Sequence, residues 1–343
     1  MRSLVIGGTG LISSSVVRGL VARGDDVVVL NRGLGDRPLP DGVRRLVADR
    51  ADKPTFEEAT RTNGPWDVVI DMICYRPEEA AGVVDAVAGV TAQYIMTSTI
   101  DVYRKPAGRY PYTEDEPQRG IGQYALDKAA CERILWSAHV RGDLPLTVIR
   151  PAATYGDRHL PVHSLGRRTT YLDRLRRGLP IVVHGDGSSF WVSCHADDVA
   201  RAFVGAAGNQ AAIGRSYHAT GEEWLTWDQH HAVVAEAIGA PPPVIVHIPT
   251  DALARMAPRH TKLVVENFQY SNIFDNAAAR RDLGFLYTIA LRDGIPGWYQ
   301  SLERAGLIEE AEADPLEDAL IETWHRHVEA GASELAHLGL DDS

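Results

Sequence analysis

The stretch Ser3-Leu-Val-Ile-Gly-Gly-Thr-Gly-Leu-Ile-Ser13 combines a short apolar run, a glycine-rich turn and the beginning of an amphipathic helix. The apolar run predicts a buried strand, and the apolar residues that follow recur at the spacing of one helix face. These residues are Leu11, Val16, Val17, Leu20 and Val21. The stretch therefore predicts a strand, a tight turn and a helix in direct succession, which is the repeating unit of an α/β fold.

The glycines of this turn have separate roles. Gly7 allows the chain to reverse tightly, and Gly10 has no Cβ to hold a pyrophosphate away from the amides at the helix N-terminus, where partial positive charge favours an anion. The third position of the pattern is Ser13, which is still small enough for helix and strand to approach each other. The pattern indicates either a dinucleotide-binding loop or a plain strand-to-helix turn.

Composition limits the possible classes of function. The chain has 343 residues, 45% of them hydrophobic and 24% charged, which is typical of a soluble protein with one large or two small domains. A net charge of -11 disfavours non-specific binding to nucleic acids or membrane surfaces. Cys74, Cys131 and Cys194 have the spacing of neither a disulfide framework nor a metal site. With no apolar run long enough to span a membrane and no room for a signal peptide, we expect a cytoplasmic protein without a metal.

Further apolar runs alternate with helical patterns along the chain. This alternation predicts a parallel sheet covered on both faces, a Rossmann-type doubly wound fold. We expect residues 1–155 to form a dinucleotide-binding domain and 156–343 mainly a smaller substrate-binding domain with C-terminal helices, with parts near 192–219 returning to the large sheet. After the first strand, the expected strands are residues 27–30, 45–48, 66–73, 93–99 and 146–150.

The ends of the second and third strands concern the adenosine half of a dinucleotide. Asn31 and Arg32 stand where an acidic residue would bind the ribose hydroxyls of NAD, and an arginine there can meet a 2′-phosphate. NADP is therefore slightly favoured over NAD, unless Arg32 is simply solvated. Asp49 and Arg50 follow the third strand, in position to bond or stack near the adenine.

Tyr124 and Lys128 follow the loop 103–122 and lie four residues apart, so they share one face of a predicted helix. An ammonium beside a phenol stabilises the phenolate and favours general base catalysis, and a neighbouring hydroxyl can share a substrate oxygen. Such a pair is common by chance. It becomes informative here because a dinucleotide loop precedes it and hydroxyl residues end the 93–99 strand.

Taken together, these residues resemble the extended short-chain dehydrogenase/reductases, also called the NAD-dependent epimerase/dehydratase family. The resemblance implies that Tyr124 exchanges a proton with a substrate hydroxyl, that Thr99, or less well Ser98, bonds the same oxygen, and that Lys128 binds the nicotinamide ribose. The motifs occur in family order: the Gly7 to Ile12 loop, Asp49, 97–103, Tyr124 with Lys128, 150–156, 185–187 and 195–200.

The resemblance also assigns the remaining site residues. Cofactor contacts are expected from Gly7, Thr9, Gly10, Leu11, Ile12, Asn31, Arg32, Asp49, Arg50, Met72, Ile73, Lys128 and Pro151. Substrate contacts are expected from Cys74, Tyr75, Ala153 and Trp191.

Several positions depart from the family pattern. Sugar-nucleotide dehydratases carry Asp-Glu directly after the catalytic threonine, whereas this chain has Ile100 and Asp101, so we do not expect dehydration. Asp101 remains either an auxiliary catalytic acid or base or a carboxylate that bonds loop amides.

Two residues that normally grip a diphosphate are also replaced. Ala153 stands in place of an asparagine and Trp191 in place of an arginine, which removes charge-assisted bonds to phosphate. Trp191 either stacks on a substrate ring or packs in the core. The arginines of 167–177 are either replacement cations or the solvated face of an amphipathic helix. We expect 309–314 to be a solvated acidic turn before a final helix, 315–336, that docks through Leu316, Leu320 and Trp324.

The preferred hypothesis is an NAD(P)-dependent epimerase or ketoreductase acting on a secondary alcohol or ketone of a sugar-like metabolite, including a nucleotide sugar. The segment between the fourth and fifth strands is short, so we expect either a monomer or a homodimer. One alternative is an RNA-associated protein, because Asn31-Arg-Gly33 also resembles the chloroplast stem-loop-binding branch of the superfamily. Another is a cofactor-sensing regulator without turnover.

Overall fold

The computed structural model describes residues 1–35 and 37–338, which form two compact units. The first unit comprises Met1–Gly156, Val192–Trp224 and Asn272–Gly294. The second comprises Asp157–Trp191, Leu225–Ser271 and Ile295–Ser343. The sequence patterns did not reveal that Asn272–Gly294 belongs to the first unit, because its contacts come from loops and a short helix rather than from a strand.

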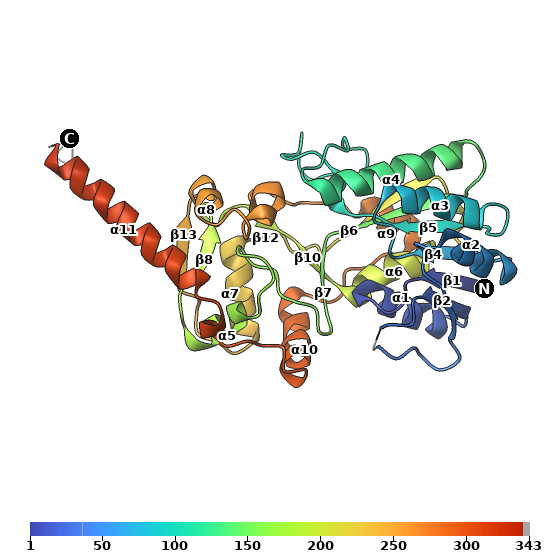
Figure 1. Ribbon diagram of the computed structural model, residues 1–343, viewed down its shortest axis with the longest axis horizontal. Helices are drawn as coiled ribbons and strands as arrows, with labels where there is room; N and C mark the ends of the chain where they lie inside the picture. Colours follow the sequence, from blue (N-terminus) through green and yellow to red (C-terminus); the bar gives the residue numbers. More distant parts are fainter. Residues whose placement is uncertain (36, 339–343) are drawn as a thin grey trace. The chain divides into compact units, whose positions relative to one another are not determined.

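The first unit is built on a seven-stranded parallel sheet in the order β3-β2-β1-β4-β5-β6-β11 (Figure 1). The predicted Rossmann-type α/β fold is therefore confirmed, with β11 as the seventh strand. The strands are β1 Arg2–Ile6, β2 Asp26–Asn31, β3 Arg44–Val47, β4 Val68–Asp71, β5 Tyr94–Thr97, β6 Leu146–Pro151 and β11 Arg215–Ala219.

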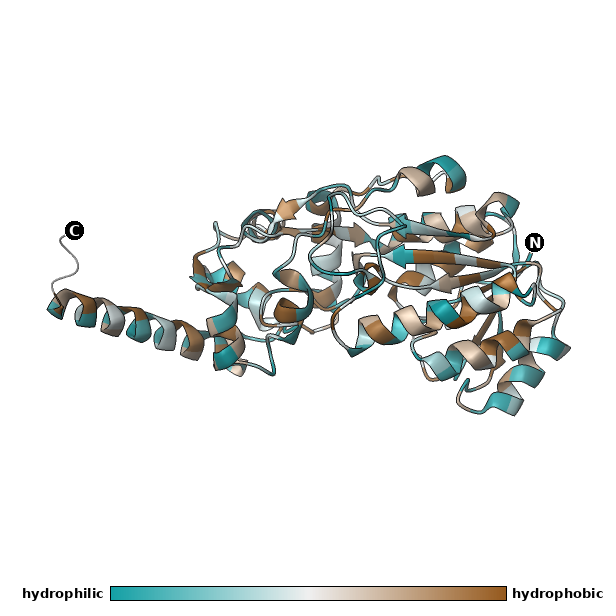
Figure 2. Cartoon of the chain, turned by 90° about the horizontal axis from the view of Figure 1, so that it is seen from above, coloured by the Kyte–Doolittle hydropathy of each residue, from teal (hydrophilic) through white to brown (hydrophobic). Residues whose placement is uncertain are grey.

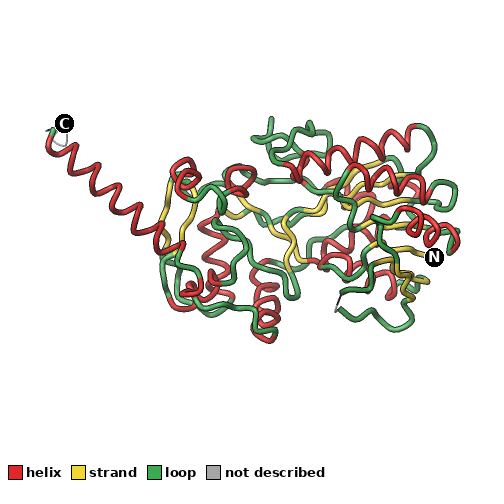
Figure 3. Tube along the Cα trace, viewed as in Figure 1, coloured by secondary structure: helices red, strands yellow, loops and turns green. Residues whose placement is uncertain are grey.

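Three helices cover each face of this sheet (Figure 3). Alternate residues of a strand point to opposite faces, so Val5 belongs to one apolar core while Leu4 and Ile6 belong to the other. One face is covered by α1 Leu11–Ala22, α6 Ala196–Ala206 and α9 Ala277–Leu283. The other is covered by α2 Lys53–Thr62, α3 Pro77–Val87 and α4 Gln123–Val140. These helices alternate between hydrophilic and hydrophobic residues, as covering helices must (Figure 2).

Strands β4 and β5 end earlier than the apolar runs predicted. The Asp71 carboxylate accepts a hydrogen bond from the Ile73 amide at 3.0 Å, which turns the chain out of the sheet. Thr99 caps the short 3₁₀ helix Ile100–Val102, its hydroxyl accepting from the Asp101 amide at 3.2 Å. The residues expected to be functional thus lie in loops at the carboxyl edge of the sheet, where α/β folds bind ligands.

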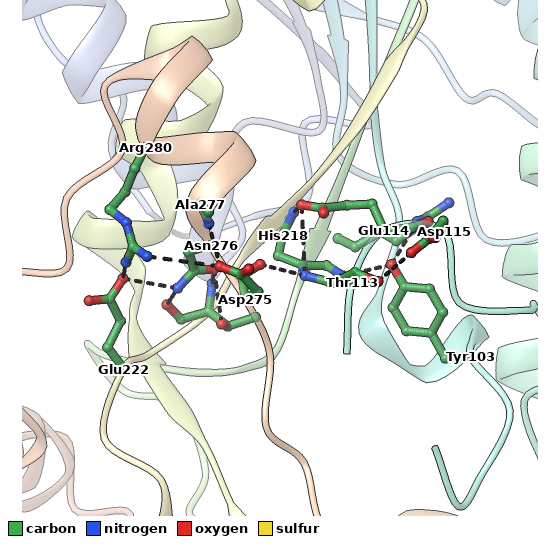
Figure 4. A network of polar contacts seen from close by, with 12 residues as sticks. Tyr103, Thr113, Glu114, Asp115, His218, Glu222, Asp275, Asn276, Ala277 and Arg280 are labelled. Atoms are coloured by element: carbon green, nitrogen blue, oxygen red, sulfur yellow. Dashed lines mark hydrogen bonds and ion pairs between the residues drawn. The ribbon is translucent and has the colours of Figure 1, made fainter. Parts of the chain in front are cut away.

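A polar network attaches the Asn272–Gly294 segment to β11 (Figure 4). The Tyr103 hydroxyl lies 2.6 Å from His218 Nε2, and His218 Nδ1 lies 2.9 Å from the Asp275 carbonyl. Arg150 donates to the Tyr103 oxygen at 2.7 Å, so the phenol proton goes to His218 and the imidazole proton to Asp275. Burial lowers the pKa of His218 to about 3, which is consistent with this neutral form.

Two smaller strands complete the first unit. Strands β7 Ala153–Tyr155 and β10 Ser193–His195 form a parallel pair. The His195 ring caps α6, with Nδ1 accepting from the Asp197 amide at 3.2 Å.

The second unit contains a parallel strand pair, an antiparallel strand pair and several helices. The first pair is β8 Ile181–His184 with β13 Ile245–Ile248, and the second is β9 Phe190–Trp191 with β12 Leu225–Thr226. The α-helices that lie in this unit or enter it are α5 Thr170–Arg177, α7 Trp227–Ala237, α8 Thr250–Met256, α10 Leu291–Arg304 and α11 Leu316–His337.

The solvated-face interpretation of the α5 arginines and the expected solvated acidic turn each hold only in part, because Arg177 and Glu312 are 41% and 65% exposed but pair with each other. Arg177 bonds the Glu312 carboxylate at 2.7 Å, and Arg174, only 1% exposed, lies 3.5 Å from Glu317. Arginines of α5 thus pair with carboxylates that lie about 140 residues later in the chain. Residue spacing gives no sign of this pairing. Leu320 and Ile321 are buried, so the first part of α11 docks as expected.

A cluster of buried rings forms much of the core of the second unit. Trp191 stacks on Trp227 with ring centroids 4.9 Å apart and meets Phe268 edge-on at 4.8 Å. His230 and His231 both lie next to Trp227. The structure therefore supports the core-packing interpretation of Trp191. Across the residues described, no helix is long and apolar enough to cross a membrane.

Candidate active site

Two glycines of the turn between β1 and α1 differ in what the fold demands of them. Gly8 has φ +79°, and a Cβ there would lie 2.5 Å from Val29 Cγ1, so the fold itself requires glycine. Gly10 has an ordinary φ of -80°, and its Cβ would meet only Ser13 Oγ at 3.3 Å. A Cβ at Gly10 therefore meets one side chain and no backbone, so the fold alone does not exclude a larger residue there. The pyrophosphate contact expected at Gly10 remains a prediction.

Other expected cofactor residues gather at this turn. A Cβ on Gly7 would lie 3.3 Å from both Met72 and Ile73, so the loop after β4 lies against the glycine turn. The Asn31 side chain donates to the Gly7 carbonyl at 2.9 Å and accepts from the Gly33 amide at 2.9 Å. Asn31 thereby fixes the glycine turn to the loop after β2, a structural role that the sequence did not reveal.

The residues expected at the adenosine end have different surroundings. Arg32 and Asp49 are exposed, and Asp49 accepts from the Ala51 amide at 2.9 Å. Arg50 does not extend toward a ligand as expected, because its two terminal nitrogens bond the Asp71 carboxylate at 3.1 and 3.0 Å. Arg37, for which the sequence offered no spacing signal, donates from its guanidinium to Ser14 in the first half of α1 at 3.2 Å.

Tyr124 and Lys128 lie on the first turns of α4, as predicted. The Tyr124 side chain is 48% exposed, whereas Lys128 is 1% exposed. Lys128 Nζ donates to the carbonyls of Cys74 and Thr97, both at 2.8 Å. Burial lowers the pKa of Lys128. These bonds fix the ammonium between the ends of β4 and β5, one helical turn from the Tyr124 phenol.

Thr99, expected to share the substrate oxygen, is mostly buried at the end of β5. Asp101, two residues further on, lies 3.6 Å from the ammonium of Lys105. Lys105 is itself buried and donates to Asn272 at 3.1 Å. Burial lowers the pKa of Lys105 to about 8, against the opposing effect of Asp101. Asp101 is thus paired with a cation, a partner that the sequence analysis did not anticipate.

A buried ionic cluster behind the site was also missed. Glu132 lies on α4 one turn beyond Lys128, and its carboxylate receives bonds from Arg150, Ser98 and Gln118. Burial alone would raise the pKa of Glu132, but the charge and hydrogen bonds of Arg150 hold it below its ordinary value. The four-residue spacing of Tyr124, Lys128 and Glu132 was the available signal, because it places all three on one helix face.

The four residues expected to contact substrate have different surroundings. The Cys74 side chain is completely buried beside Cys131 in an apolar core, so it is not available to a substrate. Tyr75 is half exposed, and Ala153 begins β7. Trp191 is buried in the ring cluster of the second unit. Within the described residues, no group of three or more potential ligands could hold a metal ion.

The parallel sheet, the glycine turn before α1 and the tyrosine-lysine pair on α4 are the features expected of a dinucleotide-binding α/β protein. A family model described as "NAD dependent epimerase/dehydratase family" matches residues 3–219. The chain belongs to this family, as the motifs indicated.

Curated relatives in this family have diverse functions. The chain is 29% identical over 277 residues to 2'-dehydrokanamycin reductase of Streptomyces kanamyceticus, covering 80% of this chain and 77% of the relative. It is 30% identical over 326 residues to UDP-glucose 4-epimerase of Mycolicibacterium smegmatis, covering 86% and 96%. It is also 29% identical over 259 residues to the chloroplast stem-loop binding protein of 41 kDa b of Arabidopsis thaliana, covering 72% and 65%.

Among solved structures, UDP-glucose 4-epimerase of Thermus thermophilus in complex with NAD aligns with a TM-score of 0.70 at 25% identity. The alignment covers 89% of this chain and all of the epimerase chain. These similarities show the family and the fold.

Proposed function

We propose that this protein is an NAD(P)-dependent epimerase or ketoreductase that acts at a secondary alcohol or ketone carbon of a sugar-like metabolite. The observation that carries the proposal is the position of Lys128. Its ammonium is held by two backbone carbonyls at the ends of β4 and β5, one turn from a half-exposed Tyr124 on the same helix face.

In this proposal, Tyr124 exchanges a proton with the substrate oxygen, and the Thr99 hydroxyl bonds that same oxygen. Lys128 stabilises the phenolate electrostatically and orients the nicotinamide ribose. The loop after β4 and the glycine turn position the dinucleotide, which when bound supplies the hydride chemistry. Asp101, with Lys105 beside it, is an auxiliary acid or base at the same end of the sheet.

The preference between NAD and NADP is part of the proposal. Arg32 is exposed at the end of β2, and Arg37 extends to the first half of α1. Two guanidinium groups in this region support binding of a 2′-phosphate, and hence NADP. A preference for NADP is in turn more consistent with a reductase that exchanges its cofactor at each turnover than with an epimerase that retains it.

The substrate class follows from the missing phosphate-binding groups. Ala153 offers no side-chain donor, Trp191 is packed among rings, and Arg174 and Arg177 are paired with carboxylates. These observations support a polyhydroxylated substrate without a diphosphate. The similarity to 2'-dehydrokanamycin reductase favours the same choice.

Two experiments test this proposal. The purified protein is denatured and any released nucleotide is identified by mass spectrometry, while a second sample is titrated with NADH and NADPH. Retained NAD would favour an epimerase, whereas an empty site that prefers NADPH would favour a reductase. Tyr124→Phe should abolish turnover of ketosugars without a diphosphate, while dinucleotide affinity stays within about twofold. Failure of both dinucleotides to bind would refute the proposal.

The cofactor-sensing alternative predicts dinucleotide binding without turnover in the wild-type protein. The RNA-associated alternative predicts RNA affinity that falls as salt rises. It is motivated by the similarity to the chloroplast stem-loop binding protein and is disfavoured by the net charge of -11. Absence of RNA binding at low salt would eliminate it.

A further inference from the structure

The ammonium of Lys128 is fully occupied in this structure. Two of its three protons go to the Cys74 and Thr97 carbonyls, both at 2.8 Å. The Tyr75 ring also lies against the ammonium, with Nζ 4.5 Å from the ring centroid, a cation–π geometry. Lys128 is 1% exposed, so a ribose hydroxyl cannot reach its ammonium while the surrounding groups, Tyr75 among them, keep these positions.

The backbone and the side chain of Tyr75 differ in how firmly they are held. The Tyr75 amide donates to the Glu79 carboxylate at 2.7 Å, and the same carboxylate accepts from the Arg76 amide at 3.0 Å at the start of α3. Tyr75 as a whole residue is 46% exposed, although partial burial raises the pKa of its phenol. Within the described residues, the hydrogen bonds of Tyr75 are those of its backbone. Rotation of the side chain about a fixed backbone would therefore uncover Lys128 without disturbing α3.

We propose that Tyr75 is a gate over Lys128, whose ring must rotate away before the nicotinamide half of a dinucleotide can bind. This inference rests on the proposed function, because it takes the ribose to be the partner of Lys128. While the Tyr75 ring covers Lys128, the dinucleotide cannot bind. The apparent dinucleotide affinity is therefore reduced by the fraction of molecules in which the ring has rotated away. The ring adds no cost to a nucleotide that occupies the adenosine half alone.

The test compares Tyr75→Ala with the matched variant Tyr75→Phe, which keeps the ring and therefore the gate. Titrations followed by calorimetry use NADH and NADPH as full-length probes and ADP as a probe without the nicotinamide ribose. We expect Tyr75→Ala to bind the better dinucleotide about tenfold more tightly than wild type, with ADP affinity changed less than about twofold. Tyr75→Phe should match wild type for all three nucleotides.

A second measurement does not depend on nucleotides. Acetic anhydride acetylates exposed amines, and mass spectrometry gives the rate at Lys128 relative to exposed Lys262 in the same sample. This relative rate should rise in Tyr75→Ala and stay unchanged in Tyr75→Phe, because only the first variant uncovers the ammonium.

The outcomes separate the gate from the proposed function. If dinucleotides bind but Tyr75→Ala and Tyr75→Phe have equal affinities, the gate is refuted and the function stands. Weaker dinucleotide binding by Tyr75→Ala would also refute the gate, because the ring would then be a stacking partner of the bound nucleotide. If neither dinucleotide binds any of the three proteins, the proposed function and the gate are both refuted.

Discussion

Arg150 and Glu132 form a bidentate ion pair in the interior of the first unit, with Nε to Oε1 at 2.9 Å and Nη2 to Oε2 at 2.6 Å. Both side chains are almost completely removed from solvent. The pair connects α4, which carries Tyr124 and Lys128, to the end of β6. Arg150, the arginine of the Arg150-Pro151 motif, therefore has a structural role: its guanidinium binds Glu132.

Removing one member of this pair should destabilise the protein strongly. Arg150→Met leaves the Glu132 carboxylate buried without its counterion, and we expect a loss of about 3–5 kcal/mol in the free energy of unfolding, measured in urea. Adding Glu132→Gln to Arg150→Met should recover part of the loss, because no buried charge then remains. As a control, Arg281→Ala removes an exposed guanidinium from its pair with the partly buried Asp282 and should lower the free energy of unfolding only slightly. A similar small cost for Arg150→Met would contradict this account.

Substitutions at Gly8 and Gly10 should separate folding from binding. Gly10→Ala meets only Ser13 Oγ at 3.3 Å, so we expect nearly wild-type thermal stability but a large loss of dinucleotide affinity, because a methyl group enters the expected pyrophosphate site. Gly8→Ala would place a Cβ 2.5 Å from Val29 Cγ1 at φ +79°, so it should unfold the protein or lower its melting temperature markedly. Thermal unfolding and dinucleotide titration measure the two effects. Unchanged affinity in a folded Gly10→Ala variant would argue against a pyrophosphate contact at Gly10.

Glu317 should make the second unit less stable as pH rises. Its carboxylate accepts from the Val182 amide at 2.6 Å, and burial raises its pKa from 4.5 to about 7, against the opposing effects of this bond and of Arg174 at 3.5 Å. The folded state therefore holds this proton more tightly than the unfolded chain does. The stabilisation is complete below pH 4.5 and is lost as pH rises through about 7, a change of the order of 3 kcal/mol. Glu317→Gln should remove this slope in urea unfolding, whereas exposed Glu322→Gln should retain it.

His230 should make the second unit less stable as pH falls, the opposite of the effect of Glu317. The side chain is buried beside Trp227, and burial lowers its pKa from 6.5 to about 4. The unfolded chain binds the proton more readily, so the stabilisation is complete above pH 6.5 and is lost as pH falls through about 4. His230→Leu should make the acid side of the stability profile less steep, while buried His163 and His184, whose pKa values are also lowered, keep part of the slope. Unfolding is followed by tryptophan fluorescence between pH 7 and 4. His325→Leu, on the exposed part of α11, is the matched control and should leave the slope unchanged.

The sequence predicted the α/β fold because strand and helix periodicities are local. The strand at Ser3 to Ile6, the glycine turn and the helix from Leu11 are all encoded within a few residues of one another. Strand ends were predicted less well, because Asp71 and Thr99 end β4 and β5 through side-chain bonds to loop amides rather than through a change in hydrophobicity. The return of Asn272–Gly294 to the first unit could not be predicted, because long-range polar contacts determine it.

The same distinction holds for the site. Tyr124 and Lys128 could be paired from the sequence because four residues correspond to about one helical turn. The sequence by itself thus determined the succession of strands and helices in the first unit, the glycine turn before α1 and the side chains that share a face of α4, since each depends on spacing along the chain. Only the tertiary structure decided that Arg50 belongs to Asp71, that Arg150 belongs to Glu132, and that Tyr75 covers Lys128. Those pairings depend on which side chains come together when distant segments pack, and residue spacing along the chain does not predict this.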